Sequence, residues 1–167
     1  MVTLTVLEGC SILEEGSSTT STTAGDDVAP APTTPTGSPT PFGSLLPGQC
    51  FDTLPAREQE AFAVLVVPCE QPHTFELYDQ LVWTDAAGKK ANLSVTYPDE
   101  TTVRTRAEAQ CLERFEPWVG ASWTQSDFDI QAWWPSSESW ARGDRSVLCA
   151  VYRYDGERST GTARESG

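Results

Sequence analysis

Basic residues are missing from the first 49 positions of this 167-residue chain. That stretch holds five of the chain's 24 acidic residues, which leaves 19 acidic against 11 basic residues, a net charge of −8, in residues 50–167. An acidic surface repels phosphate backbones, whereas nucleic-acid binding requires clustered lysine and arginine. We therefore expect no nucleic-acid partner.

Long apolar runs are also missing. The longest covers residues 61–68 (AFAVLVVP), far short of the roughly 20 residues that a transmembrane helix needs. We expect no segment to span a bilayer, so any attachment to a membrane would come through a lipid anchor.

Catalytic signatures are equally scarce. A Ser-His-Asp triad would require His73, the single histidine, and no Gly-x-Ser-x-Gly motif is present. Glu76 follows His73 by three residues, but in a strand such positions face opposite sides, and two ligands are too few for a metal site. We therefore predict a structural role for both residues, with no metal, no cofactor and no catalytic residue. Because carboxylates are plentiful, a hydrolase such as a glycosidase remains a remote alternative.

Serine, threonine, proline and glycine dominate the chain up to residue 49. This composition cannot bury enough apolar surface to fold. We predict a disordered tether over residues 11–44, preceded by a remnant of a signal-like segment over residues 1–10. The folded domain is expected over residues 45–167.

Periodicity within residues 45–167 predicts one helix among several strands. The helix is expected between residues 99 and 118, with apolar positions Val103, Ala107, Cys111, Leu112 and Phe115, a cap at Thr101 or Thr102, and an end at Pro117 and Gly120. Strands are expected at residues 61–67, 74–82, 127–134 and 146–154, the last joined by a turn at Asp155-Gly156 to a partner at residues 160–164. The prediction is an α+β fold, an antiparallel sheet with one main helix packed on one face.

Four cysteines, Cys50, Cys69, Cys111 and Cys149, lie beside these elements without the CxxC spacing typical of metal sites. Their even number predicts two disulfides and hence an oxidising compartment; free buried thiols in the cytosol are the alternative. Three pairings are possible. We favour Cys50–Cys69, which joins neighbouring segments, and Cys111–Cys149, which fixes the helix to a strand.

Cys10 stands apart, in the sequence LEGC of residues 7–10, which resembles the lipobox of bacterial lipoproteins. We predict lipidation at Cys10 and a location outside the cytoplasm, anchored to the cell membrane or secreted. Glu8 and the lack of a basic segment depart from the signal-peptide pattern. An unmodified cysteine or a reactive thiol is the alternative.

Several motifs together resemble the septum formation domain of actinobacterial envelope proteins. They are residues 46–52 (LPGQCFD), residues 67–73 (VPCEQPH) with Glu76, Cys111 in its helix, and residues 139–149 (SWARGDRSVLC). Gln49 replaces the aspartate that the family favours. The resemblance implies an accessory role outside the cytoplasm, linked to division septa, with no established catalytic residues.

Residues 142–144 (RGD) mimic an adhesion motif, but they lie inside the longer motif that begins near Trp140. We predict a structural role instead: Gly143 for a turn, Asp144 for side-chain bonds to the backbone, and Arg145 paired with a carboxylate.

Trp133 and Trp134 are adjacent in a predicted strand, so their side chains must point to opposite faces. We expect one in the core and the other exposed on the face that the helix leaves open, as a weak candidate for binding; burial of both is the alternative. The predicted function is a non-catalytic interaction module that binds an unidentified envelope or division protein. Binding of a cell-wall glycan or peptide is the alternative.

Overall fold

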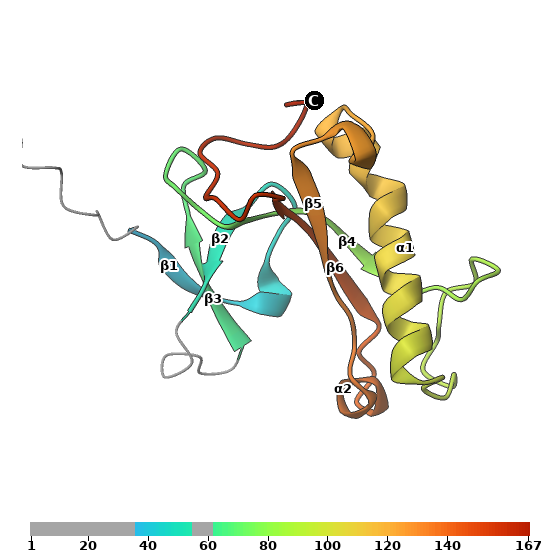
Figure 1. Cartoon of the computed structure of the whole chain (residues 1–167). Helices are drawn as coiled ribbons and strands as arrows, with labels where there is room; N and C mark the ends of the chain where they lie inside the picture. Colours follow the sequence, from blue (N-terminus) through green and yellow to red (C-terminus); the bar gives the residue numbers. More distant parts are fainter. Residues whose placement is uncertain (1–35, 55–61) are drawn as a thin grey trace, which may run out of the picture. The chain divides into compact units, whose positions relative to one another are not determined.

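A computed structural model describes residues 36–54 and 62–167 of the chain. Six strands form one sheet in the order β1-β3-β2-β4-β6-β5, and every neighbouring pair is antiparallel. The strands are β1 (Ser38–Pro41), β2 (Cys50–Thr53), β3 (Ala63–Val67), β4 (Phe75–Val82), β5 (Phe128–Trp133) and β6 (Ser146–Arg153). The main helix is α1 (Glu100–Val119). Three shorter helices are the 3-10 helices η1 (Phe42–Ser44) and η4 (Trp123–Gln125) and the α-helix α2 (Ser137–Ala141). The predicted α+β fold is confirmed (Figure 1).

Helix α1 begins and ends close to the predicted positions. Its N-cap is Asp99, whose carboxylate accepts the backbone N–H of Thr102, so the predicted threonine cap is wrong. Pro117 lies inside the last turn, where it removes one i→i−4 hydrogen bond without stopping the helix, and Gly120 ends the helix with φ 86°. Leu112 is predicted to belong to the apolar stripe but is exposed. The buried stripe runs through Cys111 and Phe115, and Leu112 lies beside it, one residue further around the helix.

One face of the sheet packs against α1 (Figure 1). A bulge in β4 between Leu77 and Asp79 changes which residues reach this face. Tyr78 turns toward the helix, and Leu81 and Trp83 lie on the same side, although uninterrupted alternation would put both on the face of Leu77. The buried residues here combine aliphatic side chains, the disulfide of Cys111 and Cys149, and several rings: Val103, Ala107, Val119, Val147, Tyr78, Trp83, Phe115 and Trp140.

The opposite face is concave and carries an aromatic cluster whose outer rings, Phe42, Phe75 and Trp133, are only partly buried, in line with the expected partly open face. Rings of Phe42, Phe51, Phe75 and Trp133 contact one another with centroid distances of 4.8 to 6.1 Å. Phe42 follows β1 and Trp133 ends β5, the two outermost strands. Their contact shows that the sheet is curved enough for η1 to reach the end of β5 across this face, while β1 and β5 remain unpaired with each other.

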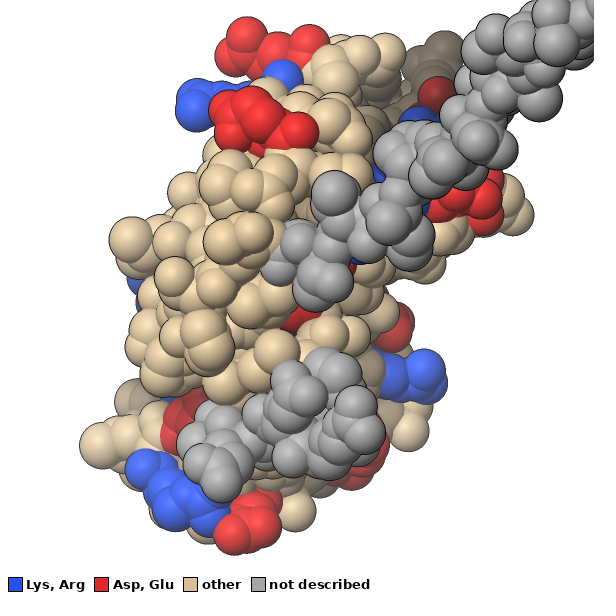
Figure 2. Space-filling view, turned by 90° about the vertical axis from the view of Figure 1, so that its left-hand side faces the viewer, with Lys and Arg blue, Asp and Glu red and all other residues tan. Residues whose placement is uncertain are grey.

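The folded region starts earlier than the predicted residue 45. Ser38–Pro41 pairs with β3, and Phe42 of η1 enters the aromatic cluster, so residues 38–44 belong to the domain rather than to the tether. Figure 2 views the β1 and β3 end of the molecule, where uncharged residues prevail and charged groups lie near the margins. The predicted signal-like segment, residues 1–10, and residues 11–35 of the predicted tether lie outside the described residues.

The C-terminal segment does not form the predicted hairpin partner at residues 160–164. Ser159 instead makes an isolated bridge with His73, because the chain leaves β6 at a turn and crosses to the start of β4. Further on, Glu165 and Gly167 donate backbone N–H groups to Trp118 and Val119 at the end of α1. None of the helices in residues 36–54 and 62–167 has the length and hydropathy needed to cross a membrane.

Candidate binding site

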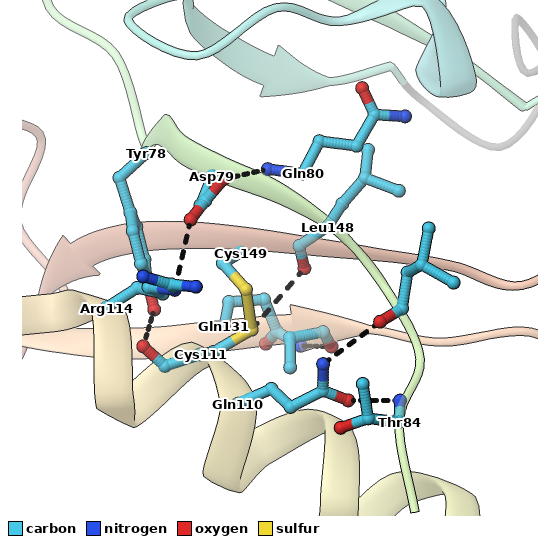
Figure 3. The surroundings of a disulfide bond; sticks show 12 residues. Tyr78, Asp79, Gln80, Thr84, Gln110, Cys111, Arg114, Gln131, Leu148 and Cys149 are labelled. Atoms are coloured by element: carbon cyan, nitrogen blue, oxygen red, sulfur yellow. Dashed lines mark hydrogen bonds and ion pairs between the residues drawn. A yellow bond between two sulfur atoms is a disulfide. The ribbon is translucent and has the colours of Figure 1, made fainter. Parts of the chain in front are cut away.

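The structure contains both predicted disulfides, and each fixes a different part of the sheet. Cys111–Cys149 joins α1 to β6 in the fully buried core. Tyr78 donates its hydroxyl to the carbonyl of Cys111 at 2.7 Å, and burial raises the pKa of that hydroxyl well above its ordinary value. Beside the disulfide, Gln110 joins α1 to Val82 O and to the N–H of Thr84 (Figure 3). This region is therefore structural.

Cys50–Cys69 lies at the start of β2, next to His73 and Glu76. Potential ligand atoms of Cys50, His73 and Glu76 lie within 4.8 Å of one another, so the expectation that His73 and Glu76 face apart is wrong. The reason is that His73 precedes β4 and does not follow its alternation. The sulfur of Cys50 is already bonded to Cys69, which leaves two donors among the described residues, fewer than a metal site needs.

Both buried groups of this cluster make structural hydrogen bonds. His73 Nδ1 lies 2.9 Å from Gln71 O, and the His73 backbone pairs with Ser159. Glu76 accepts Thr162 Oγ1 and the N–H of Ala163, each at 2.6 Å. His73 and Glu76 thus attach the C-terminal segment to the sheet.

In the motif around Trp140, the guanidinium group of Arg145 is buried and is held by backbone carbonyls and a ring. Arg145 lies 3.7 Å from the Trp140 ring centroid and donates to four carbonyl oxygens: Trp140 O, Asp144 O, Asn92 O and Val95 O. In the described part of the chain no ion pair includes Arg145, so the predicted carboxylate partner is wrong. Backbone dipoles and the indole face replace it.

The other motif residues occupy their predicted places. Gly143 has φ 97°, a left-handed conformation that suits glycine, and Asp144 accepts the N–H of Ser146 at 2.8 Å. Trp140 donates to Val95 O at 2.7 Å. The motif therefore ties residues 92–95 to the turn before β6.

Trp133 and Trp134 point to opposite faces, as predicted. Trp133 joins the aromatic cluster, while Trp134 packs on the helix side and donates to Glu100 at 2.6 Å. Both are half-buried, so the expected exposed member of the pair is absent. Binding through either residue stays a prediction.

An exposed aromatic groove lies elsewhere, and sequence reasoning missed it. It encloses about 310 Å³ and is lined by Trp123, Thr124, Ser126, Phe128 and Tyr154. Trp123 is 43% exposed and Tyr154 is 78% exposed. Of the other groove residues, Phe128 is half-buried, and Thr124 and Ser126 contribute hydroxyl groups. Among the residues that the structure describes, no charged side chain lines it. The groove thus offers ring faces and hydroxyl groups to a ligand.

Asp129 fixes the orientation of the exposed indole. Its carboxylate accepts Trp123 Nε1 at 2.8 Å, Tyr152 OH at 3.1 Å and the N–H of Ile130 at 2.7 Å. Burial, and next the nearby carboxylate of Asp129, raise the pKa of Tyr152. Trp123 and Asp129 belong to different elements, so no periodic pattern in the sequence joins them.

The family comparison covers most of the described domain. A family model described as Septum formation matches residues 47–166, which is more than half of the chain and includes every disulfide cysteine. Searches of curated proteins and of solved structures found no match. The chain belongs to the septum formation family.

Proposed function

We propose that this protein contributes to septum formation from outside the cytoplasm, as a non-catalytic module that binds an envelope or division protein. The observation that carries the proposal is the exposed groove at Trp123, an aromatic surface held in place by Asp129. Tryptophan and tyrosine dominate the energetics of protein interfaces. A ring that is already oriented loses less conformational entropy when a partner binds.

The location is supported by the two disulfides, which persist in oxidising compartments. The proposed anchor is a lipid on Cys10, which lies outside the described residues. We expect Cys10→Ser to move the protein from the membrane fraction to the soluble extracellular fraction. Retention of this variant in the membrane would contradict lipid anchoring and leave the binding proposal untouched.

The proposed lack of catalysis is supported by the burial of His73, the chain's single histidine, whose Nδ1 and backbone groups bond to the backbone of Gln71 and Ser159. Turnover of purified wall fragments by the full chain would contradict this part of the proposal.

The binding proposal is tested by photo-crosslinking in cells. A photoreactive amino acid placed at Thr124 should capture one defined partner, and Trp123→Ala should abolish capture at equal protein level. Leu93→Ala is the matched control, because Leu93 is 79% exposed but does not line the groove. Equal capture by the Trp123 and Leu93 variants would contradict the proposal.

Wall-glycan binding is the second candidate, favoured by the uncharged, hydroxyl-bearing lining of the same groove. Sedimentation with insoluble, protein-free peptidoglycan tests it. Binding that disappears in Trp123→Ala and persists in Leu93→Ala would replace the protein partner with a glycan.

A further inference from the structure

Strand β5 forms one edge of the sheet in the described part of the chain. Asp127 O accepts the N–H of Tyr154 on the side of β6, so the odd-numbered residues that follow in β5 also direct their backbone groups toward β6. The backbone groups of Phe128, Ile130 and Ala132 therefore face outward. Such groups are a template for pairing with another strand.

Three of these outward groups are capped by side chains next to them in the chain. Phe128 N–H donates to Ser126 Oγ at 3.1 Å, and Ile130 N–H donates to Asp129 Oδ1 at 2.7 Å. Gln131 Nε2 donates to Ala132 O at 2.8 Å. Rotation of a side chain is enough to remove each cap.

The opposite edge differs in kind. Strand β1 has the sequence SPTP, so Pro39 and Pro41 have no N–H to offer. That loss is permanent, whereas the caps of β5 are reversible. Of the two edges, β5 is the one able to accept a strand.

The sequence of β5 complements itself in an antiparallel pairing centred on Ile130. In this register Ile130 faces its own copy, and Phe128 faces the small side chain of Ala132, with both pairs on the helix side of the sheet. On the other side Asp129 faces Gln131, a carboxylate opposite an amide donor. The capped groups are also the ones that such a pairing would join: Phe128 N–H with Ala132 O, and Ile130 N–H with Ile130 O.

We propose that two copies of this protein associate through β5, antiparallel and with Ile130 on the two-fold axis, once the caps from Ser126, Asp129 and Gln131 turn aside. A two-fold interface uses the same patch on both copies, which this register provides. Asp129 and Gln131 exchange their contacts within one copy for contacts between copies. Since Asp129 also holds Trp123, association frees the indole that borders the groove. This inference concerns self-association and does not depend on the function proposed above.

Crosslinking tests the register. Asp129→Cys and Gln131→Cys are prepared as separate full-length proteins, each with Cys10→Ser to remove the extra thiol, and mixed under mild oxidation. Positions 129 and 131 of opposing copies would be directly opposite, with Cα atoms about 4.5 Å apart. The mixture should therefore give a disulfide-linked heterodimer in large excess over either protein alone. Thr40→Cys, on the β1 edge, is the control and should not crosslink.

Sedimentation velocity over a range of concentrations provides a readout without new cysteines. Ser126→Ala removes the cap on Phe128 N–H and leaves the Asp129–Gln131 pair intact, so its dimer dissociation constant should fall by about tenfold relative to the parent. A mixture that crosslinks no more than its separate components, or Ser126→Ala with an unchanged dissociation constant, would overturn the proposal.

Discussion

The two faces of the sheet reach a buried core by different means. The face under α1 is covered by a separate layer, and its core combines aliphatic residues with the rings of Tyr78, Trp83, Phe115 and Trp140. The concave face has no helix over it in the described residues; the sheet curls, and rings from β2, β4, β5 and η1 pack on one another. On one face the helix supplies a second layer of side chains, whereas on the other the curled sheet brings side chains from its own strands into contact.

Each half of the sheet also has its own disulfide, so the contribution of each disulfide to the free energy of unfolding can be compared. Cys111–Cys149 closes a loop of 38 residues beneath α1, and Cys50–Cys69 closes one of 19 residues at the start of β2. Loop entropy alone predicts stabilisation of about 4 and about 3 kcal/mol, respectively.

The largest expected effect is the loss of the helix-side disulfide. Replacing Cys111 and Cys149 with alanine should lower the free energy of unfolding by about 4 kcal/mol or more, because it also leaves space in the core. Replacing Cys50 and Cys69 should cost about 3 kcal/mol, since Cys69 is only half-buried. Urea denaturation of both variants checks this order. A larger loss at Cys50–Cys69 would show that the concave region is the more dependent on its crosslink.

Trp133 and Trp134 allow the two faces to be compared by single substitutions, because one ring packs on each face. Trp133→Ala should lower the free energy of unfolding by about 3 kcal/mol, because its ring contacts Phe42, Phe51 and Phe75. Trp134→Ala should cost about 1 kcal/mol, as it loses a hydrogen bond at the edge of the helix-side core. Thermal denaturation with Trp133→Phe as the conservative control tests this. Equal losses would mean that the ring cluster adds nothing to the concave face.

The buried cation at the helix-side margin should give an intermediate effect. Arg145→Lys keeps the charge but not the planar group that reaches four carbonyls and stacks on Trp140. We expect a loss of about 2 kcal/mol in the free energy of unfolding. Faster hydrogen exchange near Val95 should accompany it. Unchanged exchange there would contradict the role of Arg145 in holding residues 92–95.

Much of the helix-side architecture was predictable because it follows local periodicity. The stripe from Val103 to Phe115 repeats at helical spacing, and the cysteines in α1 and β6 fall within strongly patterned elements. The bulge in β4 was not predictable, since one extra residue reverses the alternation after Leu77 without a compositional signal.

The concave face and the binding groove depend on contacts between distant segments. Phe42 meets Trp133 only because the sheet curls, and its Ser/Thr/Pro-rich surroundings suggested a tether. Arg145 is predicted to pair with a carboxylate, but backbone carbonyls accept its hydrogen bonds instead. Because every residue has a backbone carbonyl, the sequence does not show which ones Arg145 contacts. For the same reason the link from Trp123 to Asp129 had no signature in the sequence.

The smallest expected effect concerns pH and the point where α1 meets the end of β5. Hydrogen bonds from the Thr102 hydroxyl and N–H lower the pKa of Asp99, and those from Tyr97 and Trp134 lower the pKa of Glu100. Because both pKa values are lower in the folded state, their stabilisation is complete above the ordinary values of 3.8 and 4.5 and is lost as pH falls through the folded values. Desolvation and the bond to Glu100 raise the pKa of Tyr97 to about 12, so that bond should persist through mildly alkaline conditions.

We expect acid to fray the first turn of α1 before the disulfide-linked core opens, with a small change because both carboxylates are exposed to solvent. Amide exchange at Thr102 and tryptophan fluorescence, followed below pH 5, measure it. Asp99→Asn with Glu100→Gln keeps hydrogen-bond acceptors but cannot titrate, so it should remove the transition; an unchanged acid transition in that variant would place the sensitive groups elsewhere.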